Sequence, residues 1–198
     1  MHASERDTPR VQAERSHYRD LSATLDLRRV KFIDESGINL ALTRLYGRAP
    51  RGERVLGSAP QNSGPHVTML GALSCTGLAA VMTVEGATDS DVFRAYVREV
   101  LCPTLRTGDL VVADNLSAHK AAGVQEAIAA KGARLLYLPP YSPDLTPIEQ
   151  CWAKIKTFLR AAKARTREAL DAAVRRALAT VTEADARAWF AHCGYVLH

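Results

Sequence analysis

The 198-residue sequence has no hydrophobic run that approaches the roughly 18 residues of a membrane-spanning helix, so no membrane segment is expected. Its first residues, MHASERDTPR, are polar and charged, and they give no secretory signal. The four cysteines lie far apart without a C-x-x-C pair, which argues against both a disulfide framework and a zinc site. These absences predict a cytoplasmic protein with reduced thiols.

What the sequence does have is an ordinary globular composition with a small basic excess. Hydrophobic residues make up 47% and charged residues 24%, which is typical of one folded domain and not of a disordered chain. The formal net charge of +5 permits a nucleic-acid partner without requiring one.

The order of the apolar patterns predicts an α/β fold. A strand–helix–strand unit favours parallel pairing and a hairpin is antiparallel, so one mixed sheet covered by helices is expected. Strands are predicted at residues 28–33, 66–74, 77–86, 108–114 and 133–138. Helices are predicted around 11–21, after a capping box of Thr88 and Asp91, over 117–131, from 146, and after caps at Thr166 and Thr182.

Acidic residues end two of the predicted strands. Asp34 ends RRVKFID and is the first residue of a turn expected at residues 34–37. Asp114 ends GDLVVAD. Each acid has the alternating phase of the apolar residues before it, so both side chains should point toward an interior face. A buried carboxylate is costly unless it is neutralised, and a magnesium or manganese ion would neutralise it. Glu149 lies in the first turn of the helix after the last strand.

Each acid also has a purely structural interpretation. Asp34 can begin an Asp-x-Ser-Gly turn, and Asp114 can end its strand in a turn or cap the next helix. Glu149 stands three residues after Thr146, at the capping-box position. If the three acids had unrelated structural roles, nothing would require them to lie at positions that a mixed sheet can bring together. Their placement therefore favours a shared site.

Three sequence blocks resemble a known family: FIDESGINLALTRLYGRAPRGERV, DLVVADNLSAHK and LYLPPYSPDLTPIEQCWAKIK. They are similar to the catalytic domain of bacterial insertion-sequence transposases of the Tc/mariner superfamily, within the DDE group. The resemblance covers about Arg28 to Arg160 and implies a ribonuclease H-like fold. It places an acidic triad at Asp34, Asp114 and Glu149, with 34 residues between the last two.

The resemblance also implies an activity, cleavage of DNA at transposon ends followed by strand transfer into target DNA. Two Mg²⁺ or Mn²⁺ ions would be held by the triad, with Asp34 bridging both ions and Asp114 and Glu149 each sharing one. The implied partners are transposon-end and target DNA, with a homo-oligomer as a further option. The implied location is the cytoplasm, at the nucleoid and without a membrane.

Supporting residues are indicated less directly. Asn115 and His119 follow Asp114, and His119 is expected either to contact a phosphate or orient a metal ligand, or to lie partly exposed at a helix start. Trp152 is interpreted as core packing of its helix. Basic side chains near the site could follow a DNA backbone or simply be solvated. These are Arg44, Arg48, Arg51, Arg54, Lys154 and Lys156.

The expected organisation is an N-terminal helical or linker segment at 1–27, a catalytic domain at 28–163 and C-terminal helices packed on it at 164–198. Fewer than thirty residues precede the first strand, too few for the helix-turn-helix modules that such transposases usually carry. Two alternatives to a transposase catalytic domain stay open. One is a ribonuclease H-like nuclease of another specificity, and the other is a truncated remnant that binds DNA or intact transposase without catalysing transposition.

Overall fold

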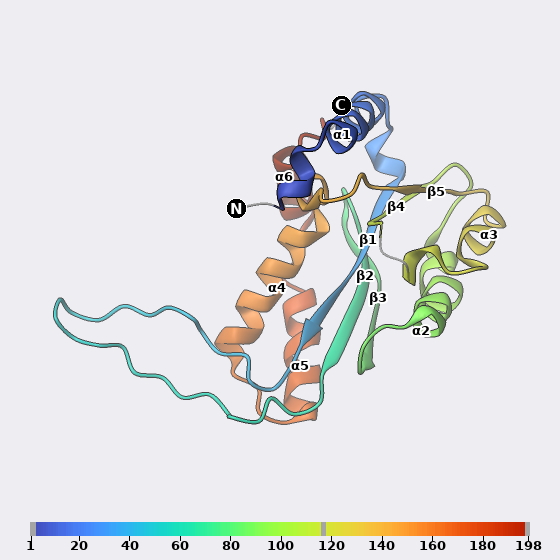
Figure 1. Cartoon of the computed structure of the whole chain (residues 1–198). Coiled ribbons are helices and arrows are strands. Elements are labelled where there is room, and N and C mark those ends of the chain that lie inside the picture. Colours follow the sequence, from blue (N-terminus) through green and yellow to red (C-terminus); the bar gives the residue numbers. More distant parts are fainter. Residues whose placement is uncertain (1–2, 116–117, 197–198) are drawn as a thin grey trace.

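The computed structural model describes residues 3–115 and 118–196. A five-stranded sheet in the order β3-β2-β1-β4-β5 forms its centre (Figure 1). The strands are β1 Val30–Ile38, β2 Val67–Ser74, β3 Gly77–Glu85, β4 Leu110–Ala113 and β5 Arg134–Tyr137. The helices are α1 Pro9–Ser22, α2 Ser90–Ala95 with its π-helical continuation η3 Tyr96–Leu101, α3 Val124–Ala129, α4 Ile148–Ala162, α5 Arg167–Leu178 and α6 Glu183–His192. None of the helices in these ranges is long and apolar enough to cross a membrane.

The sheet contains both kinds of pairing that the sequence predicts. β2 pairs antiparallel with β1 and β3, whereas β4 pairs parallel with β1 and β5. The parallel ladder between β1 and β4 ends at Ile33 and Ala113, but the antiparallel ladder between β1 and β2 continues to Ile38 and Val67. β1 therefore projects beyond β4, and Asp34 is the first residue of the projecting part.

The turn predicted at residues 34–37 is wrong. All four residues belong to β1 and pair with Thr68–Gly71 of β2. An antiparallel neighbour of this length gives their backbone N–H and C=O groups hydrogen-bonding partners, and this outweighs the turn preference of Asp, Ser and Gly.

Two helix predictions also need correction. Asp89, and not Thr88, caps α2, because its carboxylate accepts hydrogen bonds from the N–H groups of Asp91 and Val92. The helix expected over 117–131 is only Val124–Ala129, since Gly123 adopts φ +88° and separates it from a short 3₁₀ turn. Residue 117 itself lies outside the described residues.

The two helix caps predicted near the C-terminal end are confirmed. The Thr166 hydroxyl accepts from the N–H of Ala169 at the start of α5. Thr182 and Asp185 form a complete capping box at the start of α6.

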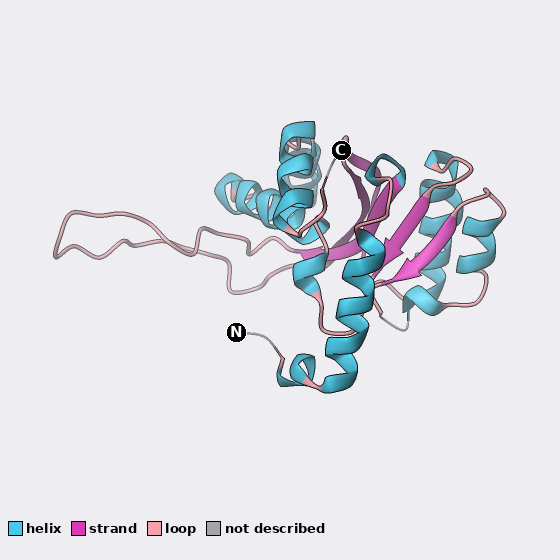
Figure 2. Ribbon diagram, turned by 90° about the horizontal axis from the view of Figure 1, so that it is seen from above, coloured by secondary structure: helices cyan, strands magenta, loops and turns pink. Residues whose placement is uncertain are grey.

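Helices cover both faces of the sheet (Figure 2). On one face, Phe32 and Val112 belong to the buried cluster that includes residues of α1, α4, α5 and α6. On the other face, Ile33 and Val111 pack with α2, η3 and α3. Strand alternation therefore directs Asp34, which shares the phase of Phe32, toward α4, and it directs Glu35 toward the α2 layer.

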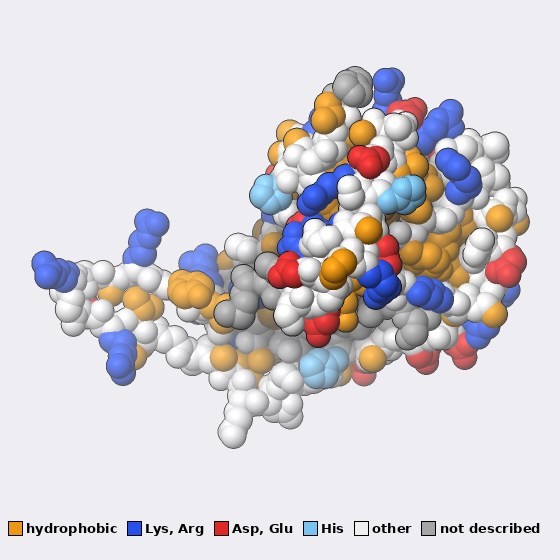
Figure 3. Space-filling view, turned by 45° about the horizontal axis from the view of Figure 1, so that its top comes forward, with side chains coloured by type: hydrophobic (Ala, Val, Ile, Leu, Met, Phe, Trp, Pro, Cys, Tyr) orange, Lys and Arg blue, Asp and Glu red, His pale blue; other side chains and the backbone are white. Residues whose placement is uncertain are grey.

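A long loop, residues 39–66, extends away from the sheet (Figure 1). We call this segment the arm. Its basic residues Arg44, Arg48, Arg51 and Arg54 are exposed, as the sequence predicts for an exposed loop. Figure 3 shows Lys and Arg side chains along the arm, at a distance from the body of the molecule.

Gly71 makes room for α4 beside the sheet. It lies opposite Asp34, and a Cβ atom there would stand 2.9 Å from Cη2 of Trp152, which is buried. We predict that Gly71→Ala lowers the free energy of unfolding by about 1–3 kcal/mol, measured by urea denaturation. Gly37→Ala is the matched control, because a Cβ on Gly37 has no neighbour within 4 Å. Equal losses in both variants would contradict the steric explanation.

Candidate active site

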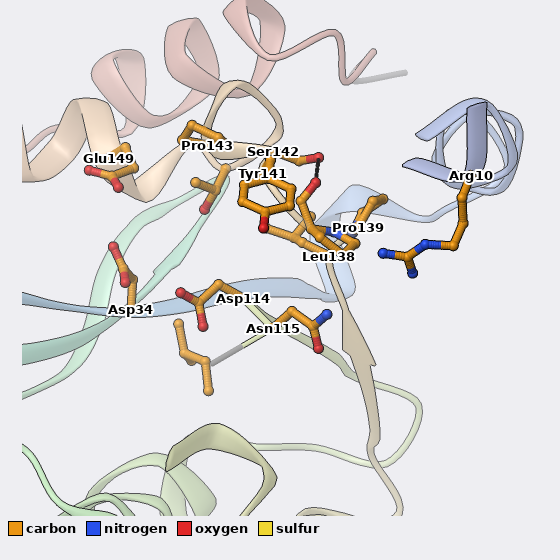
Figure 4. A pocket seen from close by; sticks show the side chains of 13 residues that line it. Arg10, Asp34, Asp114, Asn115, Leu138, Pro139, Tyr141, Ser142, Pro143 and Glu149 are labelled. Atoms are coloured by element: carbon orange, nitrogen blue, oxygen red, sulfur yellow. Dashed lines mark hydrogen bonds between the residues drawn. The ribbon is translucent and has the colours of Figure 1, made fainter. Parts of the chain in front are cut away.

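Asp34, Asp114 and Glu149 line one pocket of about 560 Å³, and Figure 4 shows their carboxylates turned toward a common space. The last parallel pair of β1 and β4 is Ile33 with Ala113. The next residue along the chain is an acid in both cases, Asp34 after Ile33 and Asp114 after Ala113. This register places two carboxylates at the same edge of the sheet. The sequence alone predicted both acids at strand ends, whereas Asp34 lies inside β1 at the point where β4 stops.

The third acid arrives through the loop between β5 and α4. This loop, residues 138–147, leaves the sheet beside β4, where the N–H of Leu138 donates to the carbonyl of Ala113 at 2.8 Å. α4 begins with Pro147 at its N-cap position and has no side-chain cap. The capping-box interpretation of Glu149 with Thr146 is therefore wrong, and Glu149 lines the pocket instead.

Trp152 connects α4 to β1. Its Nε1–H donates to Oδ2 of Asp34 at 3.1 Å, and its side chain is 1% exposed. Residues three apart on a helix lie on one side of it, so this contact also sets the position of Glu149 relative to Asp34. The helical periodicity of Trp152 predicts core packing alone and gives no sign of the hydrogen bond to Asp34.

The acids crowd one another. Burial raises the pKa of Asp34, and the charges of Glu149 and Asp114 raise it further, to about 7. Among the described residues that line the pocket, Arg10 from α1 is the one with a positive charge. The pocket is therefore rich in negative charge and would be stabilised by added positive charge.

His119 is fully buried between two carboxylates. Its Nε2 lies 2.8 Å from Oε2 of Glu35, and its Nδ1 lies 2.5 Å from Oδ1 of Asp114. Burial alone lowers the pKa of His119, but its close contacts with the carboxylates of Asp114 and Glu35 outweigh burial and raise the pKa to about 10. A charged imidazolium thus orients Asp114, and the interpretation of His119 as a partly exposed residue is wrong.

Glu35 was not identified from the sequence. The available signal was its place directly after Asp34 in a strand, which sends the two carboxylates to opposite faces of the sheet. Arg10 was also missed, because nothing in the sequence places α1 near the acids. Asn115 was identified, and it is an exposed residue of the pocket lining.

The structure does not bring the other basic candidates into this pocket. Arg44, Arg48, Arg51 and Arg54 are on the arm, and Lys156 is half-buried on α4. The ammonium of Lys154 donates to the carbonyl of Thr180, between α5 and α6, at 2.8 Å and to Asp185 of α6 at 2.6 Å.

The donor set of the pocket has the chemistry of a hard-cation site, since Asp34, Asp114 and Glu149 offer carboxylate oxygens. Within residues 3–115 and 118–196, no group of three His, Cys, Asp or Glu side chains is arranged as a ready metal cage. The three acids instead line a shared cavity of about 560 Å³. The types of side chain in the pocket therefore suit divalent ions, and the three carboxylates are not arranged as a closed coordination site.

The sequence matches the family model described as DDE superfamily endonuclease over residues 29–171. The chain belongs to this family. The predicted membership of the DDE group is thus confirmed. No curated protein sequence matches the chain.

Solved structures similar to this DDE endonuclease include those of the Mos1 transposase. The pre-cleavage Mos1 transpososome has a TM-score of 0.73 at 14% identity, covering 98% of this chain and 61% of that one. The Mos1 mariner paired-end complex with Mn has a TM-score of 0.72 at 15% identity, covering 98% and 61%. The catalytic domain of Mos1 mariner transposase has a TM-score of 0.70 at 14% identity, covering 98% and 91%. The chain thus spans about three-fifths of the transposase chains in the complexes, and the predicted ribonuclease H-like fold is confirmed.

The hydrogen bond from Trp152 to Asp34 predicts a specific loss of stability. Trp152→Phe keeps an aromatic ring but removes the N–H that the buried carboxylate accepts. We expect the free energy of unfolding at pH 8 to fall by about 1–3 kcal/mol, measured by urea denaturation. Trp189→Phe is the control, because Trp189 packs on the same core from α6. A loss no larger than that of the control would contradict a role for the hydrogen bond.

Proposed function

We propose that this DDE endonuclease is the catalytic domain of a transposase, which cuts DNA at transposon ends and joins the cut ends to target DNA. The observation that carries the proposal is the convergence of Asp34, Asp114 and Glu149 on one pocket in a ribonuclease H-like fold. The similar Mos1 structures include a paired-end complex with transposon end and a strand transfer complex, which supports DNA as the substrate.

The proposed cofactor is Mg²⁺ or Mn²⁺, with two ions in the site. Mos1 complexes and its catalytic domain have been solved with each of these metals. A DNA phosphate approaching three carboxylates would be repelled, so the pocket needs positive charge before it can accept its substrate. Bound divalent ions would supply that charge, activate the attacking hydroxyl and stabilise the leaving oxygen.

The residues of this chain have distinct parts in the proposed mechanism. Asp34, Asp114 and Glu149 would hold the metal ions through their carboxylate oxygens. Trp152 holds Asp34 in place by a hydrogen bond, and His119 holds Asp114 in place by an ion pair. Little covalent work falls to the protein, because the attacking groups are water and then a DNA 3′-hydroxyl, so rate depends on positioning and charge.

The DNA path outside the pocket is also proposed. Asn115 and Arg10 line the same pocket and can donate to a DNA backbone there. The exposed arginines of the arm, together with Lys156, are proposed to contact DNA phosphates away from the point of cleavage. Lys154 is the weaker candidate because its ammonium is already bound to α6. A homo-oligomer would be needed if two transposon ends are processed together.

We also propose that the chain consists of an N-terminal segment at 1–27, a catalytic domain at 28–163 and C-terminal helices at 164–198. The family match to residues 29–171 supports the central part, and the packing of α5 and α6 in the core cluster with α4 supports the attached C-terminal helices. Action on chromosomal DNA would place the protein at the nucleoid.

The decisive experiment uses labelled duplexes of the DNA that flanks this reading frame, with Mg²⁺ or Mn²⁺, alongside RNA–DNA hybrids. Cleavage and joining of the flanking duplexes support the transposase. Cleavage of hybrids alone supports the ribonuclease H-like nuclease instead. DNA binding without cleavage, also after addition of an intact related transposase, supports the non-catalytic remnant.

Removing any one carboxylate of the triad should abolish cleavage while the fold stays intact. We predict that Asp34→Asn, Asp114→Asn and Glu149→Gln each lower the cleavage rate by on the order of 10²–10³-fold or more, because a neutral amide keeps the shape and loses the charge. The measurement is nicking of labelled DNA in Mn²⁺, with circular dichroism as the fold check. Glu126→Gln, an exposed acid on α3, is the control. Retained nicking by any triad variant would refute its assignment.

Removal of the imidazole should affect metal use more than DNA binding. We predict that His119→Gln raises the Mn²⁺ concentration for half-maximal cleavage by about 10–100-fold, since Asp114 loses the group that orients it. The control is His66→Gln, which changes an exposed histidine. An unchanged metal requirement, with slower cleavage at every concentration, would contradict the orienting role.

A further inference from the structure

α1 precedes the residues that the family model matches, yet it is bound to the wall of the acidic pocket. The contact is made by Arg15, whose side chain is 1% exposed. Its Nη1 donates to Oγ of Ser142 at 2.6 Å and to Oδ1 of Asp144 at 3.1 Å, and its Nη2 donates to Oδ2 of Asp144 at 2.7 Å. Arg6 adds a second cation on Asp144, at 3.0 Å.

The segment that Arg15 holds is the loop of residues 138–147, which lines the pocket and leads directly into the Glu149 turn of α4. Figure 4 shows Leu138, Pro139, Tyr141, Ser142 and Pro143 along the pocket, with Arg10 of α1 facing them. Whatever fixes the shape of this loop therefore also fixes one side of the pocket and the start of α4.

The loop has few backbone interactions of its own. Prolines interrupt it at 139, 140, 143 and 147, and proline has no N–H to donate. Inside the loop, the N–H of Leu145 donates to Ser142 at 3.0 Å and that of Thr146 to Pro143 at 3.3 Å. Tyr141 has φ +54°, a left-handed conformation that a non-glycine residue keeps only when its surroundings impose it. Side-chain anchors must therefore supply much of the order.

We propose that Arg15 is a positioning residue of the active site: it fixes the 138–147 loop through Ser142 and Asp144, and through that loop it sets Glu149. The consequence for metal binding rests on the proposed function, whereas the order of the loop does not. A buried guanidinium without partners would be strongly unfavourable, so Arg15 and its two acceptors form one unit. A planar, bidentate donor suits this task better than an ammonium group.

A second observation supports the pairing of these side chains. Burial by itself raises the pKa of Asp144, but the hydrogen bonds and charge of Arg15, followed by the charge of Arg6, lower it overall. The carboxylate form of Asp144 is thus stabilised by Arg15 and Arg6. α1 is also tied to the far end of the loop, because Tyr18 shares a hydrogen bond of 2.9 Å with Tyr195, which donates to the Leu145 carbonyl at 2.6 Å.

Hydrogen exchange tests the loop directly, in the full chain and without metal or DNA. We expect Arg15→Ala to raise the exchange rate of peptides covering 138–149 by about tenfold or more, while the sheet amides of β1 and β2 are unchanged. Asp144→Asn, a milder change at a side chain that is 39% exposed, should shift the same peptides in the same direction. Arg19→Ala is the matched control, because it makes the same change at an exposed arginine of α1.

Calorimetric titration with Mn²⁺ tests the consequence for the site. Arg15→Ala should weaken Mn²⁺ binding by about 10-fold, Arg15→Lys should restore part of it, and metal-free DNA binding should stay within about twofold of the unsubstituted chain. If Arg15→Ala only destabilised the fold, thermal stability would fall, and the affinities for Mn²⁺ and for DNA would fall together.

The outcomes separate the two proposals. If loop exchange is unchanged in both Arg15→Ala and Asp144→Asn, the positioning role of Arg15 is overturned. If Arg15→Ala does not fold, the Asp144→Asn result decides in the same way. If the loop loosens as expected but the unsubstituted chain binds no Mn²⁺, the metal-dependent function fails and the hold of Arg15 on the loop stands. If the loop loosens and Mn²⁺ affinity is unchanged, the link from Arg15 to Glu149 is overturned.

Discussion

The in-register parallel pairing of β1 with β4 is the constraint on which the pocket depends. Because Ile33 pairs with Ala113, the next residues, Asp34 and Asp114, come to one edge of the sheet. A register slip of one residue would turn the side chains of the slipped strand to the opposite face and separate these carboxylates. The pairing is itself fixed by burial, since Phe32 and Val112 face one core cluster and Ile33 and Val111 the other.

Crowded carboxylates are tolerated here because other buried groups hold them. Trp152 donates to Asp34, and His119 lies between Asp114 and Glu35. These contacts join α4 and the α2 layer to the central strands, so the two helical layers meet at the acids. The same groups that stabilise the fold thus determine the geometry of the site, and the remaining negative charge of the pocket is what makes it suited to cations.

The sequence was sufficient for the order of strands and helices along the chain and for the choice of the three acids as candidates, because alternation and spacing are local properties of the chain. It was less reliable wherever a distant partner changed a local preference. Residues 34–37 have turn-forming types, yet β2 keeps them extended. Trp152 has the periodicity of a core residue, and its hydrogen bond to Asp34 exists only because α4 crosses β1. Glu35 and Arg10 could not be chosen without knowing which elements face them.

By itself the sequence determined the mixed α/β architecture, the strand phase of Asp34 and Asp114, and the family to which the residues of the three blocks belong. Only the tertiary structure decided that His119 is buried between two acids and that α1 is bound to the loop before Glu149 through Arg15. The physical reason is that periodicity depends on neighbours along the chain, whereas a buried charge is stable only beside particular partners. Those partners are 127 and 129 residues away from Arg15.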